Sequence, residues 1–422
     1  MSVKKVKVPW RAWYGDKDYK LTFPEEWDIR VFEHQGAREL TRRDIEAGID
    51  APMGSPPLDE LAKGRGSVTI AVDDLARPTP TARLLPAVIE RLTSAGVKPS
   101  DIRIIMSVAA HRPCTRQDLL KKVGEKSLDS IEVINHNPFD DLVNLGETTR
   151  GTPIQINAPF MEGDLRIGIG CIIPHYGPGF SGGGKIVLPG LAGIESLRAN
   201  HVSMGRSLPG GLARAEGNEQ QADIREAARR AGLEFIVNVV VSGKRRIVGV
   251  FAGDLVQTHC AGMEFARKVY STEVSTDIDV AVCNAYPKDT DFMQSINAFN
   301  GLVTAPPGTL KESGTVVLTT ASTEGRGYHS LFGRGMSLEK AMDVEKTFGG
   351  RELLVFSPNI AQHDVKVAYH EPVRLFRRWG RLLKALRRKH GQDCRVGIFP
   401  CGPIQLAEGY DPETNVARLI MR

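Results

Sequence analysis

The stretch of sequence that decides the fold is residues 173–190, IPHYGPGFSGGGKIVLPG, which continues to Asn200 and His201. Ahead of it, residues 165–173 are apolar and β-branched with small glycines between them, which predicts a buried strand. Glycine lacks a Cβ, so its backbone can approach a ligand closely and adopt positive φ. Successive N–H groups in such a loop form a concavity that binds anions. We therefore expect a phosphate-binding loop, followed by a helical segment that reaches His201.

One alternative for this loop is the P-loop of nucleoside triphosphatases. Residues 179–185 satisfy the pattern GxxxxGK, but Ile186 stands where that motif needs a Ser or Thr hydroxyl for Mg²⁺. Residues 188–190, Leu-Pro-Gly, also interrupt the helix whose N-terminus should face the phosphates. The sequence therefore favours a phosphate cradle without ATP chemistry.

The composition indicates a soluble enzyme-sized chain. Its 422 residues are enough for two domains, and 41% hydrophobic and 25% charged residues are ordinary for a globular protein. A net charge of +5 is small for this length, so we expect neither a nucleic-acid nor a membrane partner. We find no signal peptide and no apolar run of about 18 residues. The six cysteines form no CxxC pair, which is typical of reduced thiols in the cytoplasm.

Strands and helices alternate along most of the chain, which predicts mostly parallel sheets. The predicted strands lie at 68–72, 102–108, 131–135, 165–173, 278–283, 314–320, 352–357 and 395–400, with hairpins at 3–32 and 235–251. We expect an α/β protein with two such domains and an active site in the cleft between them. The predicted boundaries are 1–272 for the N-terminal catalytic domain, 273–405 for a C-terminal α/β domain, and 406–422 for a tail that packs back on the first domain.

Four polar residues follow predicted strands directly: Asp74, Arg77, His111 and His175. In open α/β sheets the ligand lies outside the carboxyl ends of the strands, so this shared position predicts one active site. Histidine exchanges a proton near neutral pH, and two histidines on opposite sides of a substrate suit inversion of a carbon centre. The planar guanidinium of Arg77 suits a carboxylate.

These residues belong to longer motifs that resemble the lactate racemase family, whose members use a nickel-pincer nucleotide. The motifs are DLARP at 74–78, AHRP at 110–113, PH at 174–175, GFSGGGK at 179–185, LPG at 188–190, NH at 200–201, YP at 286–287 with Gln294, and PCGP at 400–403. The resemblance covers nearly the whole chain.

The resemblance implies specific roles. Lys185 would carry the cofactor, nickel pyridinium-3,5-bisthiocarboxylic acid mononucleotide, through a thioamide. His201 would be the protein ligand to nickel, a metal that accepts imidazole nitrogen beside soft sulfur. His111 and His175 would take the substrate hydroxyl proton on either face while the α-hydrogen moves as hydride. The nucleotide and its phosphate would be held by Asp74, Leu75, Ala76, Arg77, Ser181, Gly182 and Gly183.

The sequence departs from the family in the predicted substrate pocket. Ala76 stands where the family has a threonine, Met293 where it has a tyrosine, and Asn297 where it has a lysine that helps Arg77 neutralise the lactate carboxylate. Asn297 carries no charge, and a charge-assisted hydrogen bond is roughly twice as strong as a neutral one. We therefore expect a larger 2-hydroxy acid or a sugar-type substrate, bound by Arg77, Gln294 and Asn297, rather than lactate.

Two other functions remain open from the sequence. One is a protein that binds the nickel nucleotide without racemising a substrate, and the other is an unrelated phosphate-binding metabolic enzyme in which His201 is structural. The paired histidines favour the racemase or epimerase, since storage of a cofactor needs no acid/base pair. Cofactor biosynthetic enzymes are the expected protein partners, and the oligomeric state is not predicted.

Overall fold

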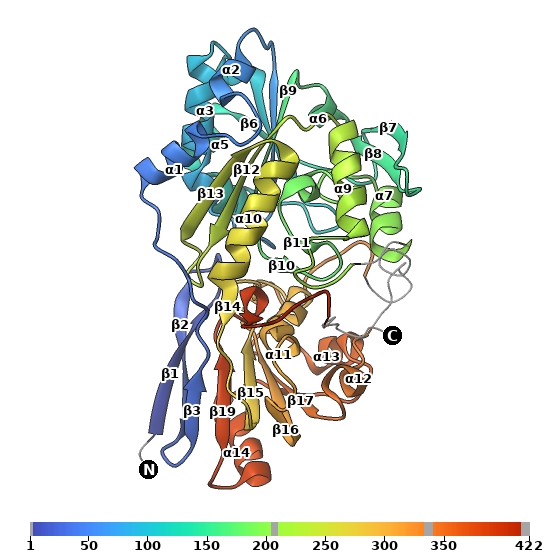
Figure 1. Cartoon of the computed structure of the whole chain (residues 1–422). Coiled ribbons are helices and arrows are strands. Elements are labelled where there is room, and N and C mark those ends of the chain that lie inside the picture. Colours follow the sequence, from blue (N-terminus) through green and yellow to red (C-terminus); the bar gives the residue numbers. More distant parts are fainter. Residues whose placement is uncertain (1–2, 204–209, 333–340, 415–422) are drawn as a thin grey trace. The chain divides into compact units, whose positions relative to one another are not determined.

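The computed structural model describes residues 3–203, 210–332 and 341–414 (Figure 1). The chain folds as two compact units: unit 1 comprises Met1–Gly36, Arg267–Tyr328 and Phe332–Arg422, and unit 2 comprises Ala37–Ala266 and His329–Leu331. Each contains its own mostly parallel sheet, as the sequence predicts.

Unit 2 is built on a six-stranded sheet with the order β13-β12-β9-β4-β5-β6. All neighbours are parallel except β12 and β13, which form the predicted hairpin. The strands are β4 (Val68–Asp73), β5 (Ile102–Ser107), β6 (Glu132–Asn135), β9 (Leu165–Cys171), β12 (Phe235–Val241) and β13 (Ile247–Gly253). The central strands are apolar and buried along nearly their whole length, which is the pattern of a sheet covered on both faces.

Helices connect and cover these strands. The α4 helix starts at a capping box, in which the Thr115 hydroxyl accepts the Asp118 N–H and the Asp118 carboxylate accepts the Thr115 N–H. The helices of unit 2 are α1 (Arg42–Asp50), α2 (Leu58–Ala62), η1 (Thr81–Arg83), α3 (Leu85–Ser94), η2 (Pro99–Asp101), α4 (Arg116–Val123), α5 (Glu125–Ser130), α6 (Ala158–Met161), α7 (Ile194–Arg198) and α9 (Glu219–Arg230), with most of α10 (Leu255–Tyr270). Short antiparallel pairs are formed by β7 (Leu142–Glu147) with β8 (Pro153–Asn157) and by β10 (Pro174–His175) with β11 (Gly179–Phe180).

The strand order of unit 2 reverses at β4. From β4 the chain continues to β5 and β6 on one side, and β9, β12 and β13 are added on the other. The loops after β4 and β9 therefore leave the sheet in opposite directions and open a crevice at the carboxyl ends of the strands, where open α/β sheets bind ligands. The glycine loop follows β9 and Arg77 follows β4, so the topology places both at this crevice.

Unit 1 contains the predicted N-terminal hairpin and a second six-stranded sheet. The hairpin pairs β1 (Val3–Trp10) with β2 (Lys17–Pro24). The sheet has the order β18-β17-β16-β15-β19-β3 and is parallel throughout. Its strands are β3 (Asp28–Val31), β15 (Ile278–Asn284), β16 (Leu310–Thr319), β17 (Glu352–Phe356), β18 (Arg374–Phe376) and β19 (Arg395–Phe399).

Two apolar clusters stabilise unit 1, one on each face of this sheet. One contains Trp27, Trp379 and Leu382, and the other contains Phe299 and Phe399. The helices are η5 (Gln294–Phe299), α11 (Asn300–Val303), α12 (Val344–Phe348), α13 (Gln362–Ala368), α14 (Trp379–His390) and η6 (Gly402–Ile404), and β14 (Ser271–Thr272) pairs with β20 (Leu406–Ala407).

The two units differ from the predicted division at residue 272 in three segments: 1–36, 267–272 and 329–331. Residues 1–36 group with the C-terminal part of the chain, because β3 is hydrogen-bonded to β19 and the β2 strand packs against α14. The start of the predicted tail forms β20, while residues 415–422 lie outside the described residues. The predicted location of the active site relative to the two domains stays a prediction.

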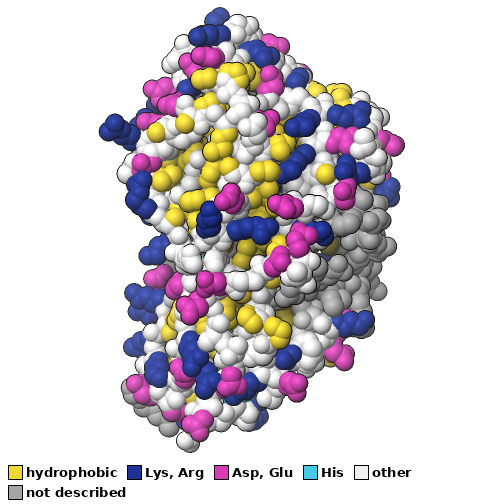
Figure 2. Space-filling model, viewed as in Figure 1, with side chains coloured by type: hydrophobic (Ala, Val, Ile, Leu, Met, Phe, Trp, Pro, Cys, Tyr) yellow, Lys and Arg dark blue, Asp and Glu magenta, His cyan; other side chains and the backbone are white. Residues whose placement is uncertain are grey.

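On the face drawn in Figure 2, Lys and Arg side chains are intermingled with Asp and Glu rather than gathered into a field of one sign. Within the described ranges, no helix combines the length and apolarity that a membrane crossing requires.

Candidate active site

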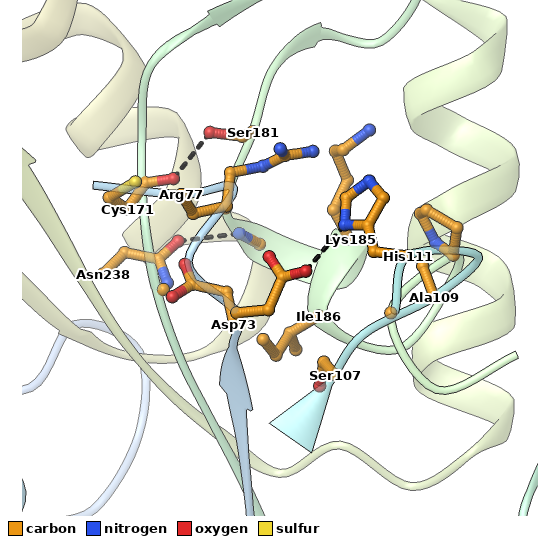
Figure 3. Close-up of a pocket in the computed structure, with 16 residues that line it drawn as sticks. Asp73, Arg77, Ser107, Ala109, His111, Cys171, Ser181, Lys185, Ile186 and Asn238 are labelled. Carbon is orange, nitrogen blue, oxygen red and sulfur yellow. Dashed lines mark hydrogen bonds and ion pairs between the residues drawn. The ribbon is translucent and has the colours of Figure 1, made fainter. Parts of the chain in front are cut away.

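A pocket lies at the carboxyl ends of β4, β5, β9 and β12, at the crevice where the strand order reverses (Figure 3). The Arg77 guanidinium, the Lys185 side chain and the His111 ring gather on one side of it. The functional side chains and glycines that line it are Asp73, Asp74, Arg77, His111, Ser181, Gly182, Gly183, Lys185 and Asn238. Of the predicted cofactor-binding residues, Leu75 and Ala76 are not among its lining residues.

Three hydrogen bonds hold the glycine loop against the sheet. The loop lies so close to its neighbours that a side chain would not fit at its glycines. The Ser181 hydroxyl donates to the Cys171 carbonyl at 2.7 Å and accepts the Ile173 N–H at 3.1 Å. The Gly183 N–H donates to the carboxamide oxygen of Asn238 at 2.7 Å. Gly182 and Gly183 have φ of +81° and +55°, and a Cβ on Gly183 would lie 2.7 Å from a ring atom of His259. Glycine is therefore required here by both conformation and space.

The helix predicted after this loop is broken. A 3₁₀ turn, η3 (Gly183–Ile186), carries Lys185, and α7 begins only at Ile194. Pro189 has no N–H and follows the loop too closely for a continuous helix to form. The structure thus agrees with the exclusion of a P-loop, whose phosphate site needs a helix N-terminus directly after the lysine.

Lys185 is a half-buried lysine that lines the pocket. Among the described residues its Nζ makes no ion pair, while Arg77 lies close enough to act on its charge. Burial, reinforced by the Arg77 charge, lowers the pKa of Lys185 to about 7. A lysine with this pKa is substantially neutral at physiological pH, and the neutral amine is the form that attacks carbonyl or thiocarbonyl carbon.

His111 is oriented by a carboxylate. Its Nδ1 lies 2.7 Å from Oδ2 of Asp74, so Nδ1–H donates to the carboxylate. The other Asp74 oxygen accepts the Ala76 N–H at 3.1 Å, which ties the carboxylate to its own loop. Burial opposes ionisation of Asp74, but His111, Arg77 and Lys122 outweigh it and lower the pKa of Asp74. A base held by a buried carboxylate is the arrangement used for general acid/base catalysis.

A buried ion pair supports the loop that carries Asp74 and Arg77. Lys122 of α4 is fully buried, and its Nζ lies 2.6 Å from Oδ1 of Asp73. The same ammonium donates to the carbonyls of Asp74 at 2.9 Å and Arg77 at 3.1 Å. The Thr79 hydroxyl donates to the second oxygen of Asp73 at 2.5 Å. Lys122 therefore fixes the backbone of this loop as well as neutralising Asp73.

His201 is held by a hydrogen bond from its ring to the backbone. It lies in a π-helical turn, Ala199–Ser203, a distortion that occurs frequently at functional sites. Its Nδ1 lies 2.9 Å from the Leu197 carbonyl, so Nδ1–H donates and Nε2 carries the lone pair that a metal would need. Burial, followed by the charge of Lys185, lowers the pKa of His201 to about 4, which keeps the ring neutral. The effect of Lys185 on this pKa places the two residues near each other.

The other predicted residues lie elsewhere in the two units. His175 is on β10 in unit 2, where its Nδ1–H donates to the Tyr176 carbonyl, and it is not one of the residues lining the pocket in Figure 3. Gln294 and Asn297 lie in η5 of unit 1, which follows β15 in the chain. The Asn297 amide donates to the Gln294 carbonyl at 2.8 Å, which leaves its second N–H and its oxygen available. The roles of these three residues toward a substrate stay predictions.

Sequence reasoning missed four residues that shape the site: Lys122, Asn238, His259 and His329. Asn238 did leave a signal, because it is the one polar residue in the buried strand FIVNVVV. His259 holds the glycine loop through a 2.9 Å bond from Nε2 to the Ser181 carbonyl, and His329 packs against His111 and His201. These residues are distant in sequence from the motifs they contact, so no local pattern identifies them.

Comparison with known proteins agrees with this geometry. A family model described as the lactate racemase N-terminal domain matches residues 14–208. The lactate racemase of Lactiplantibacillus plantarum is 34% identical over 298 residues, which are 68% of each chain. The lactate racemase of Thermoanaerobacterium thermosaccharolyticum is 29% identical over 329 residues, which are 76% of each chain.

Solved structures show the same fold. The lactate racemase apoprotein from Thermoanaerobacterium thermosaccharolyticum superposes with a TM-score of 0.76 at 22% identity, covering 96% of this chain and 100% of that one. A protein from Thermotoga maritima superposes with a TM-score of 0.65 at 16% identity, covering 89% and 100%. On the identity and coverage of its relatives, the chain belongs to the lactate racemase family.

Proposed function

We propose that this protein is a racemase or epimerase that inverts a hydroxyl-bearing carbon with a nickel-pincer nucleotide tethered at Lys185. The observation that carries this proposal is the amine of Lys185, which lies in the pocket beside the glycine loop and has a pKa lowered to about 7. An ordinary phosphate-binding lysine is useful as a cation, whereas a neutral amine is useful as a nucleophile.

The residues present suit the cofactor. Lys185 would attach it covalently, and Nε2 of His201 would bind the nickel, with Nδ1 held by the Leu197 carbonyl. The backbone N–H groups of the glycine loop and the guanidinium of Arg77 would hold the phosphate. When bound, the cofactor supplies a site that accepts and returns hydride.

The protein's own contribution is proton transfer and orientation. Nε2 of His111 would take the proton of the substrate hydroxyl, and Asp74, bonded to Nδ1, would stabilise the imidazolium that forms. His175 presents Nε2 in the same way, because its Nδ1–H donates to the Tyr176 carbonyl. With one histidine on each face of the substrate, a proton taken by one ring can be replaced by the other after inversion.

The substrate class follows from the charges available. Arg77 supplies one cation for a carboxylate, while Asn297 offers a neutral amide where the family has lysine. We propose a 2-hydroxy acid larger than lactate or a sugar-type substrate, since additional hydroxyls can use the neutral donors of Gln294 and Asn297. Enzymes that synthesise the cofactor are the partners that this function requires.

Intact-mass analysis tests the tether. Protein produced together with the cofactor biosynthetic enzymes should carry the adduct and about one nickel per chain, and Lys185→Ala should carry neither. Lys98→Ala, an exposed lysine of the same unit, is the matched control and should resemble the wild type. Wild-type protein that gains neither adduct nor nickel contradicts the proposal.

A substrate screen tests the reaction. Loaded protein is incubated with single enantiomers of 2-hydroxy acids and sugar acids, and the products are separated by chiral chromatography. We expect inversion of at least one substrate with more than one hydroxyl, at a higher kcat/KM than for lactate. An adduct without turnover of any of them would instead indicate a cofactor-binding protein.

A further inference from the structure

His329 comes from late in the sequence, yet its contacts are with the site. Residues 329–331 group with unit 2. His329 forms an isolated antiparallel bridge with His111, and the Ser330 N–H donates to the Ala110 carbonyl at 2.7 Å. This backbone pairing brings the side chain of His329 out beside that of His111.

The His329 ring packs against two other imidazoles. Its centroid lies 5.3 Å from that of His111 at an interplanar angle of 67°, and 5.8 Å from that of His201 at 69°. Both contacts are edge-to-face, the favourable geometry for planar rings. With only 8% of its surface exposed, His329 fills the space beside the proposed proton-transfer histidine and the proposed metal ligand.

The orientation of His329 is set by its own segment. Its Nδ1 accepts the Leu331 N–H at 3.2 Å, so the proton of the neutral ring is on Nε2. This bond fixes the plane of the ring independently of His111 and His201. The His329 ring therefore forms a fixed surface against the rings of His111 and His201, whose orientations set the positions of their Nε2 atoms.

In the proposed function, Nε2 is the acting atom of both rings. His111 is bonded at Nδ1 to Asp74, and His201 at Nδ1 to the Leu197 carbonyl. A tilt of either ring about its Nδ1 bond would move Nε2. A third ring in edge-to-face contact with both limits this tilt, as outer contacts commonly do for metal-binding histidines.

We propose that His329 is a positioning residue whose ring packing aims Nε2 of His111 for proton transfer and Nε2 of His201 for nickel. This inference rests on the proposed function and extends it to a residue outside the motifs shared with the family. It requires the ring itself, rather than the hydrogen bond to Leu331, to be the important feature of the side chain.

Two substitutions separate the ring from the hydrogen bond. His329→Phe keeps an aromatic ring but has no acceptor for the Leu331 N–H, whereas His329→Asn keeps an acceptor near the position of Nδ1 but has no ring. We expect His329→Phe to retain nickel within about twofold of the wild type after gel filtration. His329→Asn and His329→Ala should each lose nickel roughly tenfold, the usual scale for removing an outer contact of a metal ligand.

Further measurements distinguish positioning from loss of folding. For His329→Asn, kcat divided by the amount of bound nickel should fall, with little change in KM. Its thermal unfolding midpoint should match that of His329→Phe. His390→Ala, which removes a histidine bonded to Thr315 in unit 1, is the control and should keep its nickel. Adduct on Lys185 in the wild type shows that the proposed function stands while the inference is tested.

The inference is overturned if His329→Asn retains nickel and turnover while His329→Phe loses them, since the hydrogen bond would then be the important feature. It is also overturned if His329→Ala matches the wild type in nickel content and kcat. These results can be interpreted only when the wild-type protein carries the adduct on Lys185. A wild-type protein without the adduct contradicts the proposed function instead.

Discussion

The strand order reverses within both sheets of this protein, but the side chains around the two reversals differ. In unit 2 the reversal at β4 is surrounded by Arg77, Lys185, Asp73 and Asp74, beside a loop of glycines. In unit 1 the strands leave β15 on both sides in the same way, with β16 on one side and β19 on the other.

At the unit 1 reversal, neutral residues at or just after the ends of β15, β16 and β19 are bonded to one another. Asn284 ends β15, and its amide donates to the Pro400 carbonyl at 2.7 Å and the Pro9 carbonyl at 2.8 Å. The Thr319 hydroxyl donates to its carboxamide oxygen at 2.9 Å. In unit 2, by contrast, the Lys185 amine has no ion-pair partner among the described residues. The strand order reverses in both sheets, and at the unit 2 reversal charged side chains line a pocket.

The largest effect expected from this difference is on catalysis in unit 2. His111→Ala and His175→Ala should each lower racemisation by about 10²- to 10⁴-fold, because each removes a proton-transfer group. Nickel content should stay near that of the wild type, since neither residue is the proposed ligand. Chiral chromatography and metal analysis measure the two effects. His363→Ala, an exposed histidine in unit 1, is the control, and a large loss of nickel in either variant would contradict these roles.

The second-largest difference is expected in the free energy of unfolding when a buried contact at each reversal is removed. Lys122→Met leaves the buried Asp73 carboxylate without its cation and should lower the free energy of unfolding by about 3–5 kcal/mol. Thr319→Val removes one neutral hydrogen bond in unit 1 and should cost only about 1–2 kcal/mol. Denaturant titration measures both. Adding Asp73→Asn to Lys122→Met should recover much of the loss, and equal costs for Lys122→Met and Thr319→Val would remove this distinction between the units.

The charge environment of Lys185 predicts a pH dependence. The neutral amine is the reactive form, so acylation of cofactor-free protein by a small anhydride should show a midpoint near pH 7 at Lys185, with labelling rising as pH rises. Arg77→Met removes a charge that disfavours protonation, so the pKa of Lys185 should rise and the midpoint should move upward by up to about one pH unit. Peptide mass spectrometry reads the labelling, with Lys98 as internal reference. A midpoint that does not move would show that Arg77 has no influence on this amine.

The smallest effect is expected on kcat/KM for lactate when the neutral Asn297 of unit 1 is replaced. Asn297→Lys restores the charge that the family carries and should raise kcat/KM for lactate about fivefold, because a charge-assisted hydrogen bond adds about 1 kcal/mol. Asn297→Asp reverses the sign and should lower it. If both substitutions leave lactate turnover unchanged, residue 297 does not face the substrate carboxylate.

Much of the fold was predictable because its signals are local. The strands β4, β5, β9, β12 and β15 are apolar and rich in β-branched residues, so the local residue pattern alone predicts them. The interruption at residues 188–190 was also predictable, because proline cannot continue a helix: η3 ends at Ile186, and the helical turns that reach His201 begin at Ile194. The grouping of residues 1–36 was not predictable, because β3 is joined to β19, a strand more than 360 residues away in sequence.

The sequence by itself determined the family, the glycine loop and the proposed proton-transfer residues, because each depends on residue types at short spacing: glycines before Lys185, and His111 and His175 directly after predicted strands. Only the tertiary structure decided what surrounds them. Burial beside Arg77 lowers the pKa of Lys185, Lys122 neutralises Asp73 from another helix, and His329 reaches His111 from more than 200 residues away. Electrostatics and packing depend on distances in space, and those distances exist only once the chain has folded.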